Sequence, residues 1–237
     1  MLREFRTIQG RGLSTFDGTT GTAREFYFDD EHWTLRYLVA DTGSWLKKHS
    51  VLVEANRLGK PDGRRAVISV RLSREELNRD ASLDARKPVS QQYEMQRSRR
   101  NAWSPYRSIA SAAGWGVVAP PGPATDLSGS ERDPHLRSSA EIQSGYSILA
   151  EDGRVGLVRD FIINDDDWRI PYLVVRRNTF PFGKNVLLPT HRVDGISFRR
   201  AGIFVNLARF AIKEAPVYRA SKPITSRVEQ RLQKHYG

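Results

Sequence analysis

The chain has 237 residues, with 38 Lys and Arg against 27 Asp and Glu, a formal net charge of +11, and no cysteine. This length suits one or two small domains, and a hydrophobic fraction of 39% is sufficient for compact cores. The absence of cysteine excludes disulfides, thiolate metal sites and a cysteine nucleophile. The basic balance raises the hypothesis of a nucleic-acid or acidic-membrane partner.

Neither a targeting signal nor a membrane segment is expected. The first residues are charged where a signal peptide would be apolar, and no apolar run approaches the roughly 20 residues of a transmembrane helix. We therefore expect a cytoplasmic protein without an integral membrane segment.

The first third of the chain is predicted to form short strands. Runs rich in aromatic and β-branched residues predict strands at 24–28, 33–40, 50–54 and 66–71. Ser73 is a typical N-cap and predicts a short helix after the last of them.

A long linker rich in Pro, Gly and Ser follows. It contains a basic and aromatic segment whose candidate partner-contact residues are Arg97, Arg99, Arg100, Trp103 and Tyr106. Such residues suit stacking on bases with phosphate neutralisation. We favour the alternative, a solvated basic linker whose aromatic rings pack on a neighbouring domain.

The second half of the chain repeats the pattern of the first. Strands are predicted at 161–163, 168–175, 184–188 and 202–206, and a short helix at 208–215 ends before Pro216.

The end of the chain is a basic tail, in which cations clearly outnumber carboxylates and a helix is predicted from Pro223 onward. Its polar face carries three further candidate partner-contact residues, Arg227, Arg231 and Lys234.

The two halves align without a gap when Asp17 is placed on Asp152. Of the 61 positions from Asp17 to Leu77, 20 are identical to their counterparts, whereas chance gives about one in fifteen to twenty. The identical positions include Asp17-Gly18 with Asp152-Gly153, Trp33 with Trp168, and Tyr37-Leu38-Val39 with Tyr172-Leu173-Val174. The sequence therefore predicts an internal duplication.

The repeated motif is Asp-Gly-x-x-Gly, then Phe-x-x-x-Asp-x-x-Trp-x-x-x-Tyr-Leu-Val, then Val-Leu. It resembles the PRC-barrel family, which includes the cytoplasmic domain of the reaction-centre H subunit and the C-terminal domain of RimM. The whole chain resembles bacterial proteins with two such domains in tandem. The resemblance implies docking modules of larger assemblies, with no shared catalytic residues.

We therefore expect an all-β fold with two small PRC-type β-barrels, each closed by a short helix. The expected divisions are a first barrel at 1–82, the linker at 83–140, a second barrel at 141–219 and the tail at 220–237. The barrels are expected to pair within the chain. Trp and Tyr four residues apart on one strand, Trp33 with Tyr37 and Trp168 with Tyr172, are expected to share a face that is either core or the place where the copies meet.

Two acidic runs, at 29–31 and 165–167, raise the question of a calcium site. Their carboxylates are consecutive, so that neighbouring side chains diverge, and a hairpin turn explains them better. The five histidines have no ligand spacing, and no catalytic motif is present. We expect no catalytic residue, no metal and no cofactor.

The net charge is spread thinly along the chain except in the tail. Adjacent arginines at 64–65, 176–177 and 199–200 can still converge in space. The leading hypothesis is a non-enzymatic scaffold or docking protein with protein partners. The alternatives are an RNA- or ribosome-associated factor, and a peripheral membrane or photosynthetic-complex-associated assembly protein.

Overall fold

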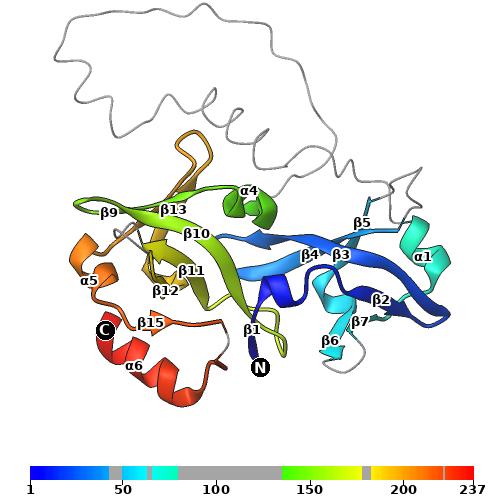
Figure 1. The fold of residues 1–237 in the computed structure, drawn as a ribbon. Helices are drawn as coiled ribbons and strands as arrows, with labels where there is room; N and C mark the ends of the chain where they lie inside the picture. Colours follow the sequence, from blue (N-terminus) through cyan, green and yellow to red (C-terminus); the bar gives the residue numbers. More distant parts are fainter. Residues whose placement is uncertain (43–49, 63–65, 80–134, 178–182, 221) are drawn as a thin grey trace, which may run out of the picture.

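The computed structural model describes residues 1–42, 50–62, 66–79, 135–177, 183–220 and 222–237. They form two β-sheets that lie side by side, the first mostly coloured blue to cyan and the second mostly green to orange (Figure 1). We call each sheet, with the helices packed on it, a lobe.

The first sheet contains β2 Gly12–Thr15, β3 Gly18–Asp29, β4 Thr34–Asp41, β5 Ser50–Glu54, β6 Leu58–Asp62, β7 Val67–Val70 and β8 Leu136–Ser138. The short helices of this lobe are η2 Ala55–Arg57 and α1 Arg74–Arg79, whereas η1 Phe5–Thr7 packs on the second sheet.

The second sheet contains β1 Leu2–Glu4, β9 Ser147–Ala150, β10 Gly153–Asn164, β11 Tyr172–Arg177, β12 Asn185–Pro189, β13 Val193–Ser197, β14 Gly202–Val205 and β15 Val217–Tyr218. Its helices are α4 Ser139–Gln143, η5 Thr190–Arg192, α5 Arg209–Lys213 and α6 Ser226–Tyr236. No helix of the described residues is both long enough and apolar enough to cross a bilayer.

The two sheets share one arrangement. In each, a strand of 12 residues (β3 or β10) pairs antiparallel with the strand before it and the strand after it. β2 pairs in parallel with β7, as β9 does with β14. The predicted all-β class is confirmed. Among the described residues no ladder joins the edge strands of either sheet, so that the pairing gives two open sheets where closed barrels were predicted.

Each sheet also receives a strand from the segment that precedes the other sheet. β1, at the start of the chain, pairs antiparallel with β10, with Leu2 opposite Asn164. β8, which precedes the second lobe, pairs antiparallel with β3, with Leu136 opposite Asp29. The last residues of the predicted linker therefore form β8 and the start of α4, and each sheet is completed by a strand from the other half.

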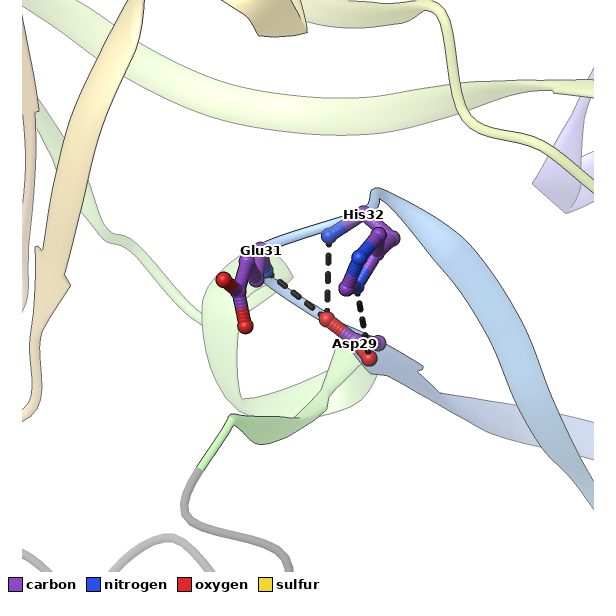
Figure 2. Close-up of side chains that lie close together, drawn as sticks. All are labelled: Asp29, Glu31 and His32. Atoms are coloured by element: carbon purple, nitrogen blue, oxygen red, sulfur yellow. Dashed lines mark hydrogen bonds and ion pairs between the residues drawn. The ribbon is translucent and has the colours of Figure 1, made fainter.

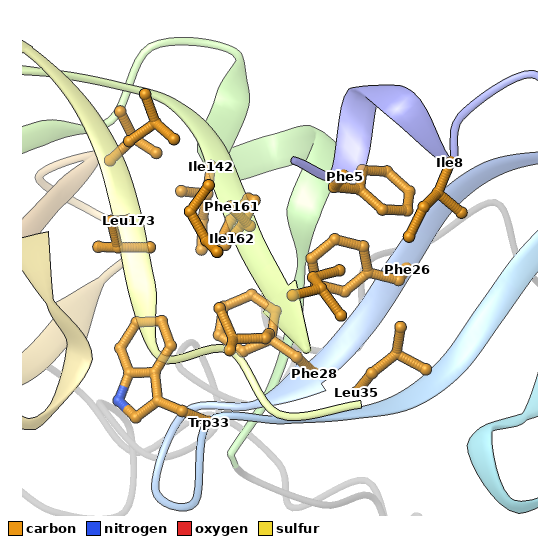
Figure 3. Packing of buried hydrophobic residues seen from close by; sticks show 14 of the residues in the cluster. Phe5, Ile8, Phe26, Phe28, Trp33, Leu35, Ile142, Phe161, Ile162 and Leu173 are labelled. Carbon is orange, nitrogen blue, oxygen red and sulfur yellow. The ribbon is translucent and has the colours of Figure 1, made fainter. Parts of the chain in front are cut away.

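One hydrophobic core runs through both lobes. Phe26 of β3 and Phe161 of β10 are fully buried and meet edge to face, with ring centroids 5.1 Å apart (Figure 3). Phe5 packs on Phe26 at 4.4 Å, and Phe28 lies 5.4 Å from Phe161. Aromatic side chains bury large apolar areas, so this cluster is the main hydrophobic link between the lobes.

Two predictions of single elements are confirmed, and one about a shared face is not. β5 has the predicted bounds, and the predicted tail helix is present as α6, which begins at Ser226. The shared face predicted for Trp33 and Tyr37 is wrong, because Trp33 belongs to the main core and Tyr37 packs on a smaller cluster. The ladder pairs Tyr27 with Tyr37 but Phe28 with Leu35, and the extra residue in β4 changes the face on which Tyr37 lies.

Candidate functional site

The lobes meet through reciprocal backbone hydrogen bonds. The Leu35 N–H donates to the Trp168 carbonyl at 2.9 Å, and the Ile170 N–H donates to the Trp33 carbonyl at 2.7 Å. In the alignment of the two halves Leu35 corresponds to Ile170 and Trp33 to Trp168. Such reciprocity is the mark of an isologous interface, in which residue i contacts j and j contacts i.

Both tryptophans adopt a backbone conformation that bulky residues avoid. Trp33 has φ of 52° and Trp168 has φ of 58°. A left-handed conformation costs roughly 1–2 kcal/mol for a residue with a Cβ atom. The cost is borne at the two positions whose carbonyls bind the other lobe, so we attribute it to the geometry of the junction.

The acidic turns hold the exchanged strands. Asp30 accepts a hydrogen bond from Arg137 Nε of β8 at 2.5 Å, and His135 Nδ1 lies 3.0 Å from the same carboxylate. In the other lobe Asp165 forms an ion pair with Arg3 of β1. The carboxylates that the sequence presents as a possible calcium site thus bind arginines from the other half of the chain.

Asp29, Glu31 and His32 form the one group among the described residues whose side chains could together hold a metal ion (Figure 2). Asp29 Oδ1 accepts hydrogen bonds from the backbone N–H groups of Glu31, at 2.9 Å, and of His32, at 3.0 Å. Burial opposes ionisation of Asp29, but these N–H groups outweigh it and lower its pKa. Both turn amides donate to this carboxylate, so we assign to it the role of stabilising the turn.

A basic groove of about 640 Å³ opens at the junction. Two of its residues come from the start of the chain and the others from the second lobe. They are Arg6, Gln9, Gln143, Arg159, Arg176, Gly183 and Asn185. Among the described residues no carboxylate lines the groove, which makes it a candidate site for an anion.

A buried carboxylate positions two of these side chains. Asp160, fully buried, accepts hydrogen bonds from Arg6 Nε and Gln143 Nε2, each at 3.0 Å, and from the Phe161 N–H at 2.8 Å. Burial raises the pKa of Asp160, and the hydrogen bond from Arg6 partly opposes this. Asp160 does not line the groove itself, but its hydrogen bonds hold the side chains of Arg6 and Gln143 in place there.

The tail residues predicted to contact partners lie on one exposed side of α6. Arg227, Arg231 and Lys234 are exposed, whereas Leu232 and Tyr236 are buried against the second lobe. The structure thus places three cations on a helix that is already docked on this chain. The other predicted contact residues, Arg97, Arg99, Arg100, Trp103 and Tyr106, lie outside the described residues.

The sequence reasoning missed most of the groove. Of the adjacent arginines, Arg176 is exposed in it, and Arg177, the next residue of β11, is buried on the other face. A signal for Gln9 and Gln143 does exist, because Leu-Arg-x-x-x-x-Ile-Gln occurs at 2–9 and again at 136–143. This second repeat is out of step with the main one by a single position, so a gapless alignment of the two halves does not detect it.

Comparison with known protein families finds a similarity in the second lobe. The model of the PRC-barrel domain family matches residues 144–207, which run from just before β9 to just after β14. No curated protein matches the chain. The similarity to the PRC-barrel domain thus rests on the second lobe.

Proposed function

We propose that this chain is a non-enzymatic docking protein, in which two PRC-type domains, derived from a duplication, pair into one body that assembles with protein partners. The observation that carries the proposal is the reciprocal exchange of β1 and β8. It ties the lobes together at both ends of the junction, and a body with one core is suited to present fixed surfaces to a partner.

The duplication is supported by contacts that recur at matched positions. Arg74 donates its backbone N–H to Asp17, and Arg209 donates its backbone N–H to Asp152, in each case 57 residues apart. The left-handed residues Ala66 and Ala201 are also counterparts in the alignment of the two halves. Together with the family match in the second lobe, these contacts support two copies of one domain.

Among the described residues, each lobe presents one exposed phenylalanine, which lies where a hairpin turn meets the lobe's short helix. Phe16 is 77% exposed and Phe210 is 72% exposed. Phe16 lies beside Asp17, in the turn bound by Arg74, and Phe210 follows Arg209, which binds the matching turn. Exposed aromatic residues are frequent anchors of protein interfaces, so these two are the contact points that we propose for a partner.

The test is affinity purification of the full chain from its native cells, followed by mass spectrometry and binding of the enriched partner in purified form. The double variant F16A/F210A is expected to lose that binding, and V217A, at a residue 47% exposed, is the matched control that retains it. Absence of any enriched protein, or equal binding by both variants, would overturn the docking function.

RNA binding is the alternative function, and the basic groove is the observation that supports it. It predicts that nucleic acid copurifies and that affinity falls steeply with salt. The membrane alternative is less well supported, because Leu232 and Tyr236, the apolar residues of α6 that would enter a membrane, are buried in this structure.

A further inference from the structure

We infer that the basic groove binds a small, multiply charged phosphate anion of the pyrophosphate class. This site goes beyond the docking function and does not depend on it. The inference is carried by a comparison of the groove with the matching place in the first lobe, where the same strands carry a different set of charges.

In the first lobe the matching arginine is fully paired. Arg24 donates to Asp41 at 3.1 Å, to Glu25 at 2.9 Å and to Ser50 at 3.0 Å. Arg24 is the extra residue of a bulge in β3, a feature that commonly redirects a side chain. The bulge thus places Arg24 beside Asp41 of β4, and the two side chains form an ordinary structural ion pair.

In the second lobe the same bulge delivers Arg159, but the charges around it are changed. Arg176 is the counterpart of Asp41 in the alignment of the two halves, so a cation takes the place of the carboxylate. Asp160, which stands in the place of Glu25, instead binds Arg6 and Gln143. Within the part of the chain that the structure describes, neither Arg159 nor Arg176 has an ion-pair partner.

Two guanidinium groups that line one groove and have no ion-pair partner among the described residues attract an anion, which can accept hydrogen bonds from both. The backbone helps to hold one of them, because Gly183 packs against the Arg176 side chain. A Cβ atom at Gly183 would lie 3.1 Å from Arg176 Nε and 2.4 Å from the Arg177 carbonyl oxygen. The absence of a side chain at Gly183 therefore leaves room for Arg176, which also contributes positive charge to the groove.

The other lining residues restrict the class of ligand. Gln9, Gln143 and Asn185 contribute side-chain amides, which donate hydrogen bonds to oxyanions. Among the described residues no aromatic or large apolar side chain lines the groove, so none of them would stack on a base or cover an apolar body. Guanidinium groups bind phosphate oxygens in a bidentate manner, and the two without an ion-pair partner in the described part of the chain suit two phosphate groups better than one.

The experiment is calorimetric titration of the full chain with inorganic pyrophosphate at low ionic strength. The test variant is R176D, which restores the arrangement of Arg24 and Asp41. The matched control is R154D, which makes the same change of charge at an exposed arginine of β10 that does not line the groove.

We expect saturable binding at one site, a loss of affinity of about tenfold or more in R176D, and an affinity close to wild type in R154D. Thermal unfolding should show that R176D is at least as stable as wild type, because the introduced carboxylate can pair with Arg159 as Asp41 pairs with Arg24. Absence of saturable binding to the wild type, or an equal loss in both variants, would overturn the inference. The docking function would survive either result, because its test uses other residues.

Discussion

The substitution Phe161→Ala removes the ring at the centre of the junction. Phe161 is fully buried and lies 5.1 Å from Phe26 and 5.4 Å from Phe28, measured between ring centroids. A buried Phe→Ala change costs about 3–5 kcal/mol through lost transfer energy and the remaining cavity. Of this cost, about 0.5–1.5 kcal/mol is the part of the aromatic pairing that exceeds simple burial. The total is a large part of the roughly 5–15 kcal/mol that stabilises a typical domain.

The assay is native-state hydrogen exchange with mass spectrometry, combined with urea unfolding. Because one core joins the lobes, F161A should lower the protection of β4 and β5 in the first lobe as much as that of β11 and β12 in the second. F16A makes the same chemical change at an exposed site and should alter stability by less than about 0.5 kcal/mol. Full protection of β4 and β5 in F161A would refute the single core and show that the lobes unfold separately.

Three further substitutions test separate contacts. D30N removes the charge that holds Arg137, and we expect a loss of about 1–3 kcal/mol, measured by urea unfolding, with faster amide exchange in β8. D152N tests pH dependence: the Arg209 N–H lowers the pKa of Asp152, so this residue's stabilisation is present at neutral pH and lost as pH falls through that pKa. Urea midpoints of D152N should therefore fall less steeply than those of wild type below about pH 4. L232A should lower the free energy of unfolding by about 2–5 kcal/mol. The loss is smaller if α6 detaches while the rest of the protein stays folded, and faster amide hydrogen exchange confined to α6 would identify that case.

D165N, at the matching turn, should affect β1 as D30N affects β8, and an effect confined to one lobe would contradict the reciprocal arrangement. An unchanged acid dependence in D152N would show that the pKa shift is not linked to unfolding. K234A, at an exposed residue of α6, should leave exchange in that helix unchanged.

Much of the secondary structure was predictable because its signals are local. Asp-Gly turns, β-branched runs and N-cap residues specify short strands and helix starts within a few neighbours. The strand exchange was not predictable in this way, because the pairing of Leu2 with Asn164 spans more than half of the chain. β1 and β8 have only three residues each, too few to show an alternating pattern.

The candidate site was harder to predict from the sequence than the fold. Asp30 and Asp165 were noticed as acidic residues, but their arginine partners lie in strands that the sequence did not predict. Arg176 belongs to an adjacent pair that the sequence marks, but its meeting with Arg159 in one groove depends on the bulge in β10, which has no sequence signal. The three linker arginines with Trp103 and Tyr106 stay a prediction, as does a role for the cations of α6.

The covalent link between the lobes has an evolutionary consequence. A dimer of two identical chains must accept every substitution twice, once at each end of its twofold axis. A single chain with the same arrangement is free of that rule, since one half can keep a residue that the other exchanges. On the duplication that we propose, Asp41 and Arg176 are such a pair, since Asp41 binds Arg24 in the first lobe and Arg176 lines the basic groove in the second.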